Sequence, residues 1–176
     1  SQERSLTKET TSGIVDYNKR IDRLVKSKGK GASVKTQQLL AELEERSARD
    51  GEGHLTPTTV TYNTVLNALA KSGEPDAATR SEAILFKMLE RHNNDCKPNT
   101  ISFNVVIAAW AKSGDKRGPE RAELILRKME ELHHLGITNV KPNIITYSAV
   151  INAWAQSNLK QSAHHAEQLL HELEQR

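Results

Sequence analysis

The sequence KPNTISFNVVIAAWAKSG at residues 97–114 decides how this chain folds, because nearly the same phrase returns as KPNIITYSAVINAWAQSN at residues 141–158. Ten of the 18 aligned positions are identical. A third copy, TPTTVTYNTVLNALAKSG, occupies residues 56–73, and a more divergent fourth, SGIVDYNKRIDRLVKSKG, occupies residues 12–29. The aromatic residue shared by the copies recurs at intervals of 45, 41 and 44 residues. Self-similarity at this spacing predicts a solenoid, in which each unit buries its apolar face against its neighbours.

Each copy has the apolar period of a helix. In the third unit the apolar positions are Phe103, Val106, Ile107 and Trp110. The spacing i, i+3, i+4, i+7 places them in one stripe of a first helix. We expect this helix to end where Gly73 and Gly114 can take the left-handed conformation, and at Asn158 in the last unit.

A second apolar stripe follows in every unit, and in the third unit it comprises Ala122, Ile125, Leu126 and Met129. Pro75 and Pro119 are expected in the first turn of this second helix, where a missing N–H is tolerated. Each unit is therefore predicted to be a helical hairpin. The predicted architecture is an all-α solenoid of about four repeats, at residues 14–58, 59–99, 100–143 and 144–176, after a polar segment at residues 1–13.

Composition narrows the functional classes. Apolar residues make up 36% and charged residues 27% of the 176 residues, as in a globular protein. A single cysteine excludes an internal disulfide and a cysteine-rich zinc site, and the histidines lack ligand spacing, so we expect no metal or cofactor. No apolar run approaches a membrane span. The net charge of +3 permits an anionic partner without requiring one.

The chain begins without Met, and its last residues continue a helical pattern. We therefore expect it to be a fragment of a longer protein. Its polar start has no apolar stretch of the kind found in a signal peptide, and a targeting segment could have been left out of the sequence.

Several of these phrases resemble the pentatricopeptide repeat family. They are VTYNTVLNALAKSG at 60–73, Met-Leu-Glu at 88–90, Met-Glu-Glu at 129–131 and KPN at 97–99 and 141–143, and the resemblance covers about residues 14–176. It implies a right-handed solenoid that binds single-stranded RNA at roughly one base per repeat, and a location in mitochondria or plastids. The units here exceed the usual length, so we expect a longer second helix and a longer connection after Met88 or Met129.

The resemblance also implies which residues read the bases. One lies just after the helix-opening aromatic and the other just after the unit-closing proline. The first set is Asn18, Asn63, Asn104 and Ser148, and the second is Thr58, Asn99 and Asn143. An amide can both donate and accept at a base edge. The implied preference is pyrimidine, pyrimidine, pyrimidine, purine from the 5′ end. For Thr58, Asn99 and Asn143, helix capping is an alternative role.

Two further sets complete the predicted site. The family position that packs against base faces holds Val15, Val60, Ile101 and Ile145, all stiff β-branched side chains. Eleven residues later come Lys26, Lys71 and Lys112, with Gln156 in the last unit. Because eleven steps of about 100° return close to the starting direction, both sets share one helix face, where lysines could contact phosphates.

The remaining expectations concern the core and the kind of function. Trp110 and Trp154 align with Leu69 and are predicted to be buried core residues, as is Cys96. No nucleophile with a base, paired carboxylates or phosphate-binding glycine loop recurs, so we expect an RNA-binding module and not an enzyme. A small-molecule substrate is not expected. The alternative function is a solenoid that binds a peptide or partner protein in its concave groove.

Overall fold

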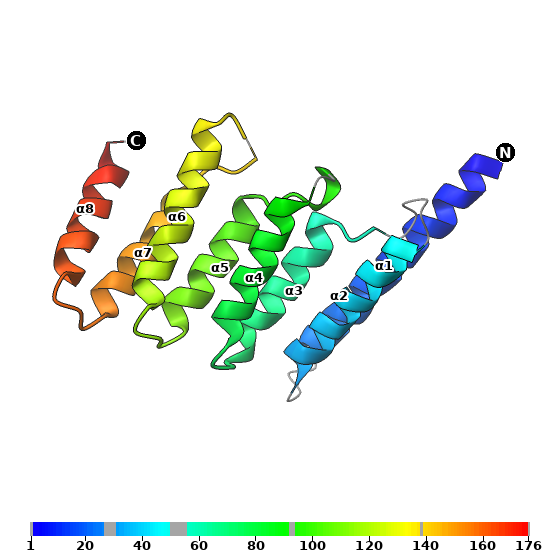
Figure 1. The fold of residues 1–176 in the computed structure, drawn as a ribbon, viewed down its shortest axis with the longest axis horizontal. Helices are drawn as coiled ribbons and strands as arrows, with labels where there is room; N and C mark the ends of the chain where they lie inside the picture. The colour runs from blue at the N-terminus through cyan, green and yellow to red at the C-terminus, as the bar shows by residue number, and fades with distance from the viewer. Residues whose placement is uncertain (1, 27–30, 50–55, 92–93, 138, 176) are drawn as a thin grey trace.

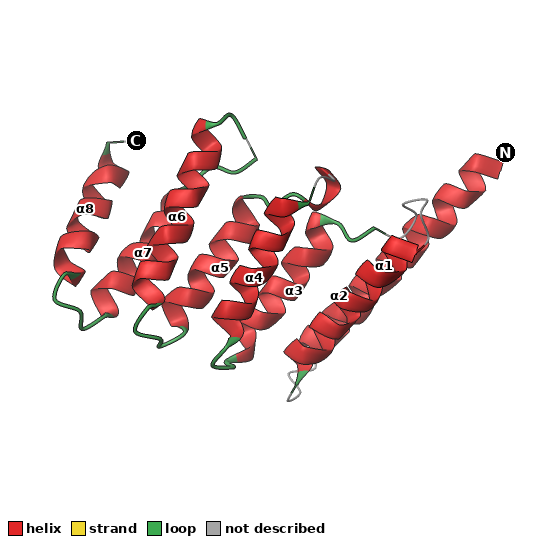
Figure 2. Cartoon of the chain, in the orientation of Figure 1, coloured by secondary structure: helices red, strands yellow, loops and turns green. Residues whose placement is uncertain are grey.

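The computed structural model describes residues 2–26, 31–49, 56–91, 94–137 and 139–175 (Figure 1). The described residues form helices and no strand (Figure 2). The α-helices are α1 (Gln2–Lys26), α2 (Ala32–Arg49), α3 (Thr59–Ser72), α4 (Ala77–Glu90), α5 (Thr100–Lys112), α6 (Gly118–His134), α7 (Ile144–Gln156) and α8 (Ser162–Glu174), and a short 3-10 helix, η1, spans Asn94–Cys96.

Successive helices pair into four hairpins that stack along one direction, with the two termini at opposite ends (Figure 1). The odd-numbered helices contact one another, α1 with α3, α3 with α5 and α5 with α7. Each even-numbered helix contacts the odd helix of its own hairpin and, up to α6, the odd helix of the next. The odd helices thus form a closely packed layer, called here the inner layer, and the even helices form the outer layer. The predicted all-α solenoid of stacked hairpins is confirmed.

One continuous apolar core runs between the two layers, from Ile21 in α1 to Leu169 in α8. The predicted stripe of α5 is buried as expected, with Phe103 fully covered and Trp110 only 2% exposed. Trp154 and Cys96 are buried as well, which confirms their assignment to the core. Removal of this apolar surface from water is the main force that holds one hairpin against the next.

The inner-layer helices α3, α5 and α7 begin with side-chain caps. The N-cap residues are Thr58, Asn99 and Asn143, and each forms a reciprocal capping box with the Thr or Ser three residues later. These bonds satisfy backbone N–H groups that the first turn leaves without an intrahelical partner. The capping role considered as an alternative for these residues is therefore real.

The helix ends agree with the predictions in part. Gly73 and Gly114 both have φ of 69°, the predicted left-handed conformation, whereas α7 ends at Ser157 in an extended conformation. Pro119 lies in the first turn of α6 as predicted. Pro75 does not lie in a first turn, because Asp76 is the N-cap of α4 and the proline precedes it.

Helix α1 is longer than the repeat pattern predicted, and helix α6 is longer than the inner helix of its own hairpin. Helix α1 begins at Gln2, so it includes the polar segment that was set apart at residues 1–13. Helix α6 has 17 residues, against 13 in its partner α5, in line with the expected longer second helix, whereas α3 and α4 both have 14 residues and do not follow that expectation. No helix in the described ranges combines the length and the apolar character needed to cross a membrane.

Candidate nucleic-acid interface

The first candidate base-reading pair lies where α3 meets the start of α5. Asn63 Nδ2 donates a hydrogen bond to Asn99 Oδ1 over 3.3 Å, and Ser102 Oγ donates to Asn63 Oδ1 over 2.6 Å. Asn99 Oδ1 also accepts from the backbone N–H of Ser102 at 3.1 Å. Stacking of the second and third hairpins therefore brings together two amides that are 36 residues apart in the chain.

The second pair lies one hairpin later, where α5 meets the start of α7, and a hydroxyl joins its two amides without a direct hydrogen bond between them. The Thr146 hydroxyl donates to Asn104 Oδ1 at 2.7 Å and lies 3.1 Å from Asn143 Oδ1. Asn143 Oδ1 also accepts from the backbone N–H groups of Ile145 and Thr146. A hydroxyl three residues after the N-cap thus holds both amides, as Ser102 does in the first pair.

The capping bonds determine which amide atoms remain available. A backbone N–H can only donate, so the capping atom of Asn99 and of Asn143 must be the carbonyl oxygen. Asn63 and Asn104 also use their oxygens, as acceptors for Ser102 and Thr146. Among the described residues, no acceptor pairs with the side-chain nitrogens of Asn99, Asn104 or Asn143. Each junction therefore offers N–H donors to a ligand, and capping and ligand contact are compatible roles.

The other candidate base-reading residues are arranged differently. Asn18 Oδ1 is buried without a hydrogen-bond partner, so within the described part of the chain it makes no hydrogen bond to Thr58. The Thr58 hydroxyl caps α3 by accepting from the Thr61 backbone N–H. Ser148 is exposed on α7, and the predicted second set contains no residue to pair with it. The structure therefore assembles two complete pairs.

The four candidate wedge residues are exposed on the inner-layer helices, although they are aliphatic. The exposed fractions are 41% for Val15, 64% for Val60, 57% for Ile101 and 64% for Ile145. Each lies two residues before a buried aromatic residue, so it faces away from the core while its neighbours fill the core. A row of exposed aliphatic side chains at the same position in each repeat is the kind of surface that binds an apolar face of a ligand.

The candidate lysines differ in how they are paired. Lys71 and Lys112 are exposed at the ends of α3 and α5, and within the described residues neither has a carboxylate at ion-pair distance. Lys26 lies 2.6 Å from Asp22 one turn earlier on α1, but both side chains are more than half exposed, and such pairs are weak. All three ammonium groups can reach an anion in solvent.

A cleft of about 780 Å³ lies between the ends of α5 and α7, and Lys112 lines it together with Lys116 and Gln156. Asp115 lines it too, and hydrogen bonds from Arg117 lower the pKa of its carboxyl to about 2, so it is ionised at neutral pH. Lys116 was not among the predicted residues. Its position after the Gly114 turn, four residues from Lys112, was the signal available in the sequence.

Ser102 and Thr146 are the other residues that the sequence predictions missed. Each holds the two asparagines of a pair in place, and each sits three residues after an N-cap. A hydroxyl at that spacing indicates a capping box, which was the available signal. No group of three metal ligands is found among the described residues.

Comparison with known proteins places these repeats in a family. The search of curated proteins found no match. The pentatricopeptide repeat domain matches residues 60–113 and 92–157, which together span more than half of the chain and contain both asparagine pairs. The chain is therefore a member of the pentatricopeptide repeat family, whose helical repeats commonly bind RNA.

Proposed function

We propose that this chain is a sequence-selective module for single-stranded RNA, in which each complete junction between hairpins contacts one base. The observation that carries the proposal is the repetition of one arrangement. Asn63 with Asn99, and Asn104 with Asn143, form equivalent pairs in successive junctions. In both junctions, two asparagines that are far apart in the chain lie together. Side-chain N–H groups of each pair have no acceptor among the described residues.

The available donors support a preference for pyrimidines. The oxygens of each pair accept bonds from the protein itself, so the pair presents amide N–H groups to a base. Cytosine offers two adjacent acceptors, N3 and O2, on its Watson–Crick edge, and uracil offers carbonyl oxygens. We therefore propose pyrimidines, cytosine ahead of uracil, at the two junctions. The less regular Asn18 and Thr58 would contribute a weaker pyrimidine site before them, and Ser148 a purine site after them.

The wedge residues would define where each base lies. Ile101 stands between the two asparagine pairs, with Val60 and Ile145 on either side of them along the inner layer. A base at each pair would then have a stiff aliphatic side chain against its face. Stacking of a base on an aromatic side chain contributes about 1–3 kcal/mol in single-strand binding proteins, and this range is the upper limit for an aliphatic wedge. Lys71 and Lys112 would lie beside this track and contact phosphates.

The small number of junctions limits the affinity. Four bases at about 1–2 kcal/mol each, less the cost of ordering the RNA, correspond to a Kd that is micromolar at best. We propose that the chain acts by holding a short tract, which masks it or presents it to other factors in RNA processing in an organelle. It would do so without turning over a substrate.

The experiment that tests this proposal exchanges one base-reading residue. In fluorescence anisotropy with RNAs that differ at single positions, Asn104→Ser is expected to change the preference at one nucleotide from pyrimidine to purine and to leave the other positions as they were. Gln168→Ser on the outer-layer helix α8 is the matched control and should change nothing. An unaltered preference in a folded Asn104→Ser chain would refute the base assignment. If the chain bound a protein or peptide and showed no salt-dependent binding of RNA, the result would instead favour the peptide-binding alternative.

A further inference from the structure

Two threonines tie the segments between hairpins to the inner-layer helices. Thr100 is the first residue of α5, and its hydroxyl donates towards the carbonyl oxygens of Asn139 and Lys141, each 3.2 Å away. The same hydroxyl accepts from the Lys141 backbone N–H at 3.0 Å, and the Thr100 backbone N–H donates to the Asn139 carbonyl oxygen at 3.0 Å. The backbone at residues 139–141 is therefore fastened at both ends to the start of α5. We call this arrangement the threonine clamp.

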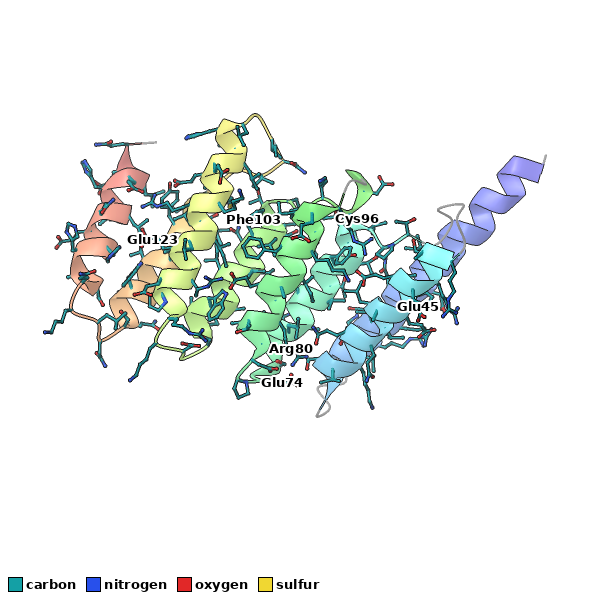
Figure 3. The ribbon with its side chains drawn as sticks, in the orientation of Figure 1. Glu45, Glu74, Arg80, Cys96, Phe103 and Glu123 are labelled. Atoms are coloured by element: carbon teal, nitrogen blue, oxygen red, sulfur yellow. The ribbon has the colours of Figure 1, made fainter. Side chains whose placement is uncertain are left out.

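The preceding junction has the same clamp. Thr59 is the first residue of α3, and its hydroxyl donates to the Lys97 carbonyl oxygen at 2.7 Å and lies 3.0 Å from that of Asp95. The residue in the middle of each clamped segment is buried, with exposed fractions of 0% for Cys96 and 1% for Val140. Figure 3 shows Cys96 near the start of α3, at the edge of the molecule opposite the turn between α3 and α4. Each segment is thus held by its backbone and by the core.

Each clamp lies next to a candidate base-reading asparagine. Only Pro142 separates Lys141 from Asn143, and because the proline is buried and its ring fixes φ near −65°, few rotations remain between the clamp and the asparagine. Thr100 also lies four residues before Asn104, which is about one helical turn. One amide of the pair therefore belongs to α5, and the other is tied to the first residue of α5. The position of one amide relative to the other depends mainly on this helix.

The junction between α1 and α3 has no threonine for such a clamp, and its candidate pair is not assembled. A hydroxyl three residues after the N-cap is present in all three junctions, as Thr61, Ser102 and Thr146, so this hydroxyl alone does not bring the two side chains together. The position of the clamp threonine holds Ile14, which lies inside α1 and has no hydroxyl. Within the described residues, Asn18 Oδ1 has no hydrogen-bond partner. The clamp therefore accompanies both pairs whose amides are joined.

We propose that Thr59 and Thr100 are positioning residues, which fix the side chains of Asn99 and Asn143 by holding the segment that precedes each of them. The inference rests on the proposed function where it concerns base recognition, and on the hydrogen bonds alone where it concerns the position of the asparagines. A clamped asparagine loses less rotational freedom when a base binds, so the clamp strengthens the base contact.

Amide hydrogen exchange followed by NMR, on the 176-residue chain without RNA, tests the clamp itself. Thr100→Val removes the hydroxyl and keeps the shape, so exchange at the Lys141 N–H should rise about fivefold, the factor that corresponds to one ordinary hydrogen bond. The side-chain amide of Asn143 should show a lower order parameter. Thr100→Ser keeps the hydroxyl and should retain both wild-type values. Thr79→Val makes the same substitution at an exposed threonine in the first turn of the outer-layer helix α4, and it should change neither value.

A crossed comparison of base preference tests the consequence for recognition. In anisotropy titrations with RNAs that differ at single positions, Thr100→Val should lower the discrimination between pyrimidine and purine about threefold to tenfold at the nucleotide that Asn104 contacts. Thr59→Val should have the same effect at the nucleotide that Asn63 contacts. Each variant should leave the other nucleotide unchanged, whereas a general loss of stability would affect both.

The proposal would be overturned by unchanged exchange at the Lys141 N–H in Thr100→Val, by an equal rise in Thr79→Val, or by equal losses of preference at both nucleotides. If Asn104→Ser changed the base preference but neither valine variant did, the proposed function would stand and the positioning role would be refuted. If the wild-type chain had no base preference, the proposed function would fail. Exchange at Lys141 and the order parameter of Asn143 would then still decide whether the clamp fixes the asparagine.

Discussion

At the scale of single residues, one asparagine side chain can perform two tasks because its two polar atoms are separate. Asn99 uses Oδ1 to cap α5 and to accept from Asn63, and its Nδ2 group has no acceptor among the described residues. Stability therefore depends on the oxygen, and base recognition in our proposal depends on the nitrogen. A substitution that changes one atom and keeps the other can separate the two roles.

Asn99→Asp is that substitution. Its carboxylate keeps the capping oxygen, so the free energy of unfolding, measured with urea, should stay within about 0.5 kcal/mol of the wild type. The second oxygen replaces the N–H donors, and it should accept from the N3–H of uracil while repelling the N3 acceptor of cytosine. Anisotropy titrations should then show a change from cytosine to uracil at one nucleotide. Asn99→Ala is the control: it should lose about 1 kcal/mol of stability along with the base preference.

At the scale of a helix, α5 divides its side chains between the core and the proposed RNA surface. Phe103 is fully buried between the layers, and Ile101, two residues earlier, is 57% exposed. Two residues along a helix correspond to a rotation of about 200°, so the two side chains leave the helix on nearly opposite sides. One short segment therefore contributes both to the stacking of hairpins and to the wedge row.

The two sides of α5 should respond differently to truncation. Phe103→Ala should lower the free energy of unfolding by about 3–5 kcal/mol, because it leaves a cavity in a fully packed core. Ile101→Ala should change it by less than about 0.5 kcal/mol, because the side chain is already largely in water. Ile101→Ala should nevertheless weaken RNA binding severalfold. Urea unfolding and anisotropy measure the two effects, and a large loss of stability in Ile101→Ala would show that this residue belongs to the core.

At the scale of the whole molecule, the tight inner layer presents the asparagine pairs, the wedge row and the lysines in register, while most ion pairs between hairpins lie in the outer layer. Arg127, for example, bridges α6 to Glu172 on α8 at 2.6 Å. The net charge of +3 is small, so in our proposal the attraction of RNA comes from the position of particular lysines. Lys112, which lines the cleft between α5 and α7, is the clearest of these.

The dependence of RNA binding on salt concentration should show whether Lys112 contacts a phosphate. When log Kd is plotted against log salt concentration, Lys112→Glu should reduce the slope by about one unit, because one phosphate contact is lost. Lys128→Glu makes the same change of charge on the outer-layer helix α6, where Lys128 already pairs with Glu131 at 2.9 Å. It should leave the slope nearly unchanged. Equal effects of the two variants would mean that overall charge, and no defined lysine track, governs binding.

Much of the fold could be predicted because the repeat is visible in local patterns. The helical stripes, the closing glycines 73 and 114 and the buried tryptophans all follow from spacing along one helix. The start of α1 at Gln2 was missed because a polar segment has no apolar stripe to reveal a helix. Pro75 was predicted in the first turn of α4 but lies one residue before the N-cap, because a proline can precede a helix or open it and Asp76 takes the cap position here.

The candidate site also has one part that the sequence predicted and one part that it did not. The alternation of buried aromatic and exposed wedge along each inner helix was predictable, because both positions belong to one short segment whose geometry is regular. The contacts of Ser102 with Asn63 and of Thr146 with Asn104 were not, because the partners lie 39 and 42 residues apart. Their distance depends on how one hairpin is set against the next.

The sequence by itself determined that this protein is an array of helical hairpins with asparagines at regular positions, since helical period and repeat length are properties of the chain read locally. Only the tertiary structure decided which asparagines meet and which of their atoms remain available. The reason is physical: those features arise from packing between segments about 40 residues apart, and packing depends on the shapes of both surfaces together.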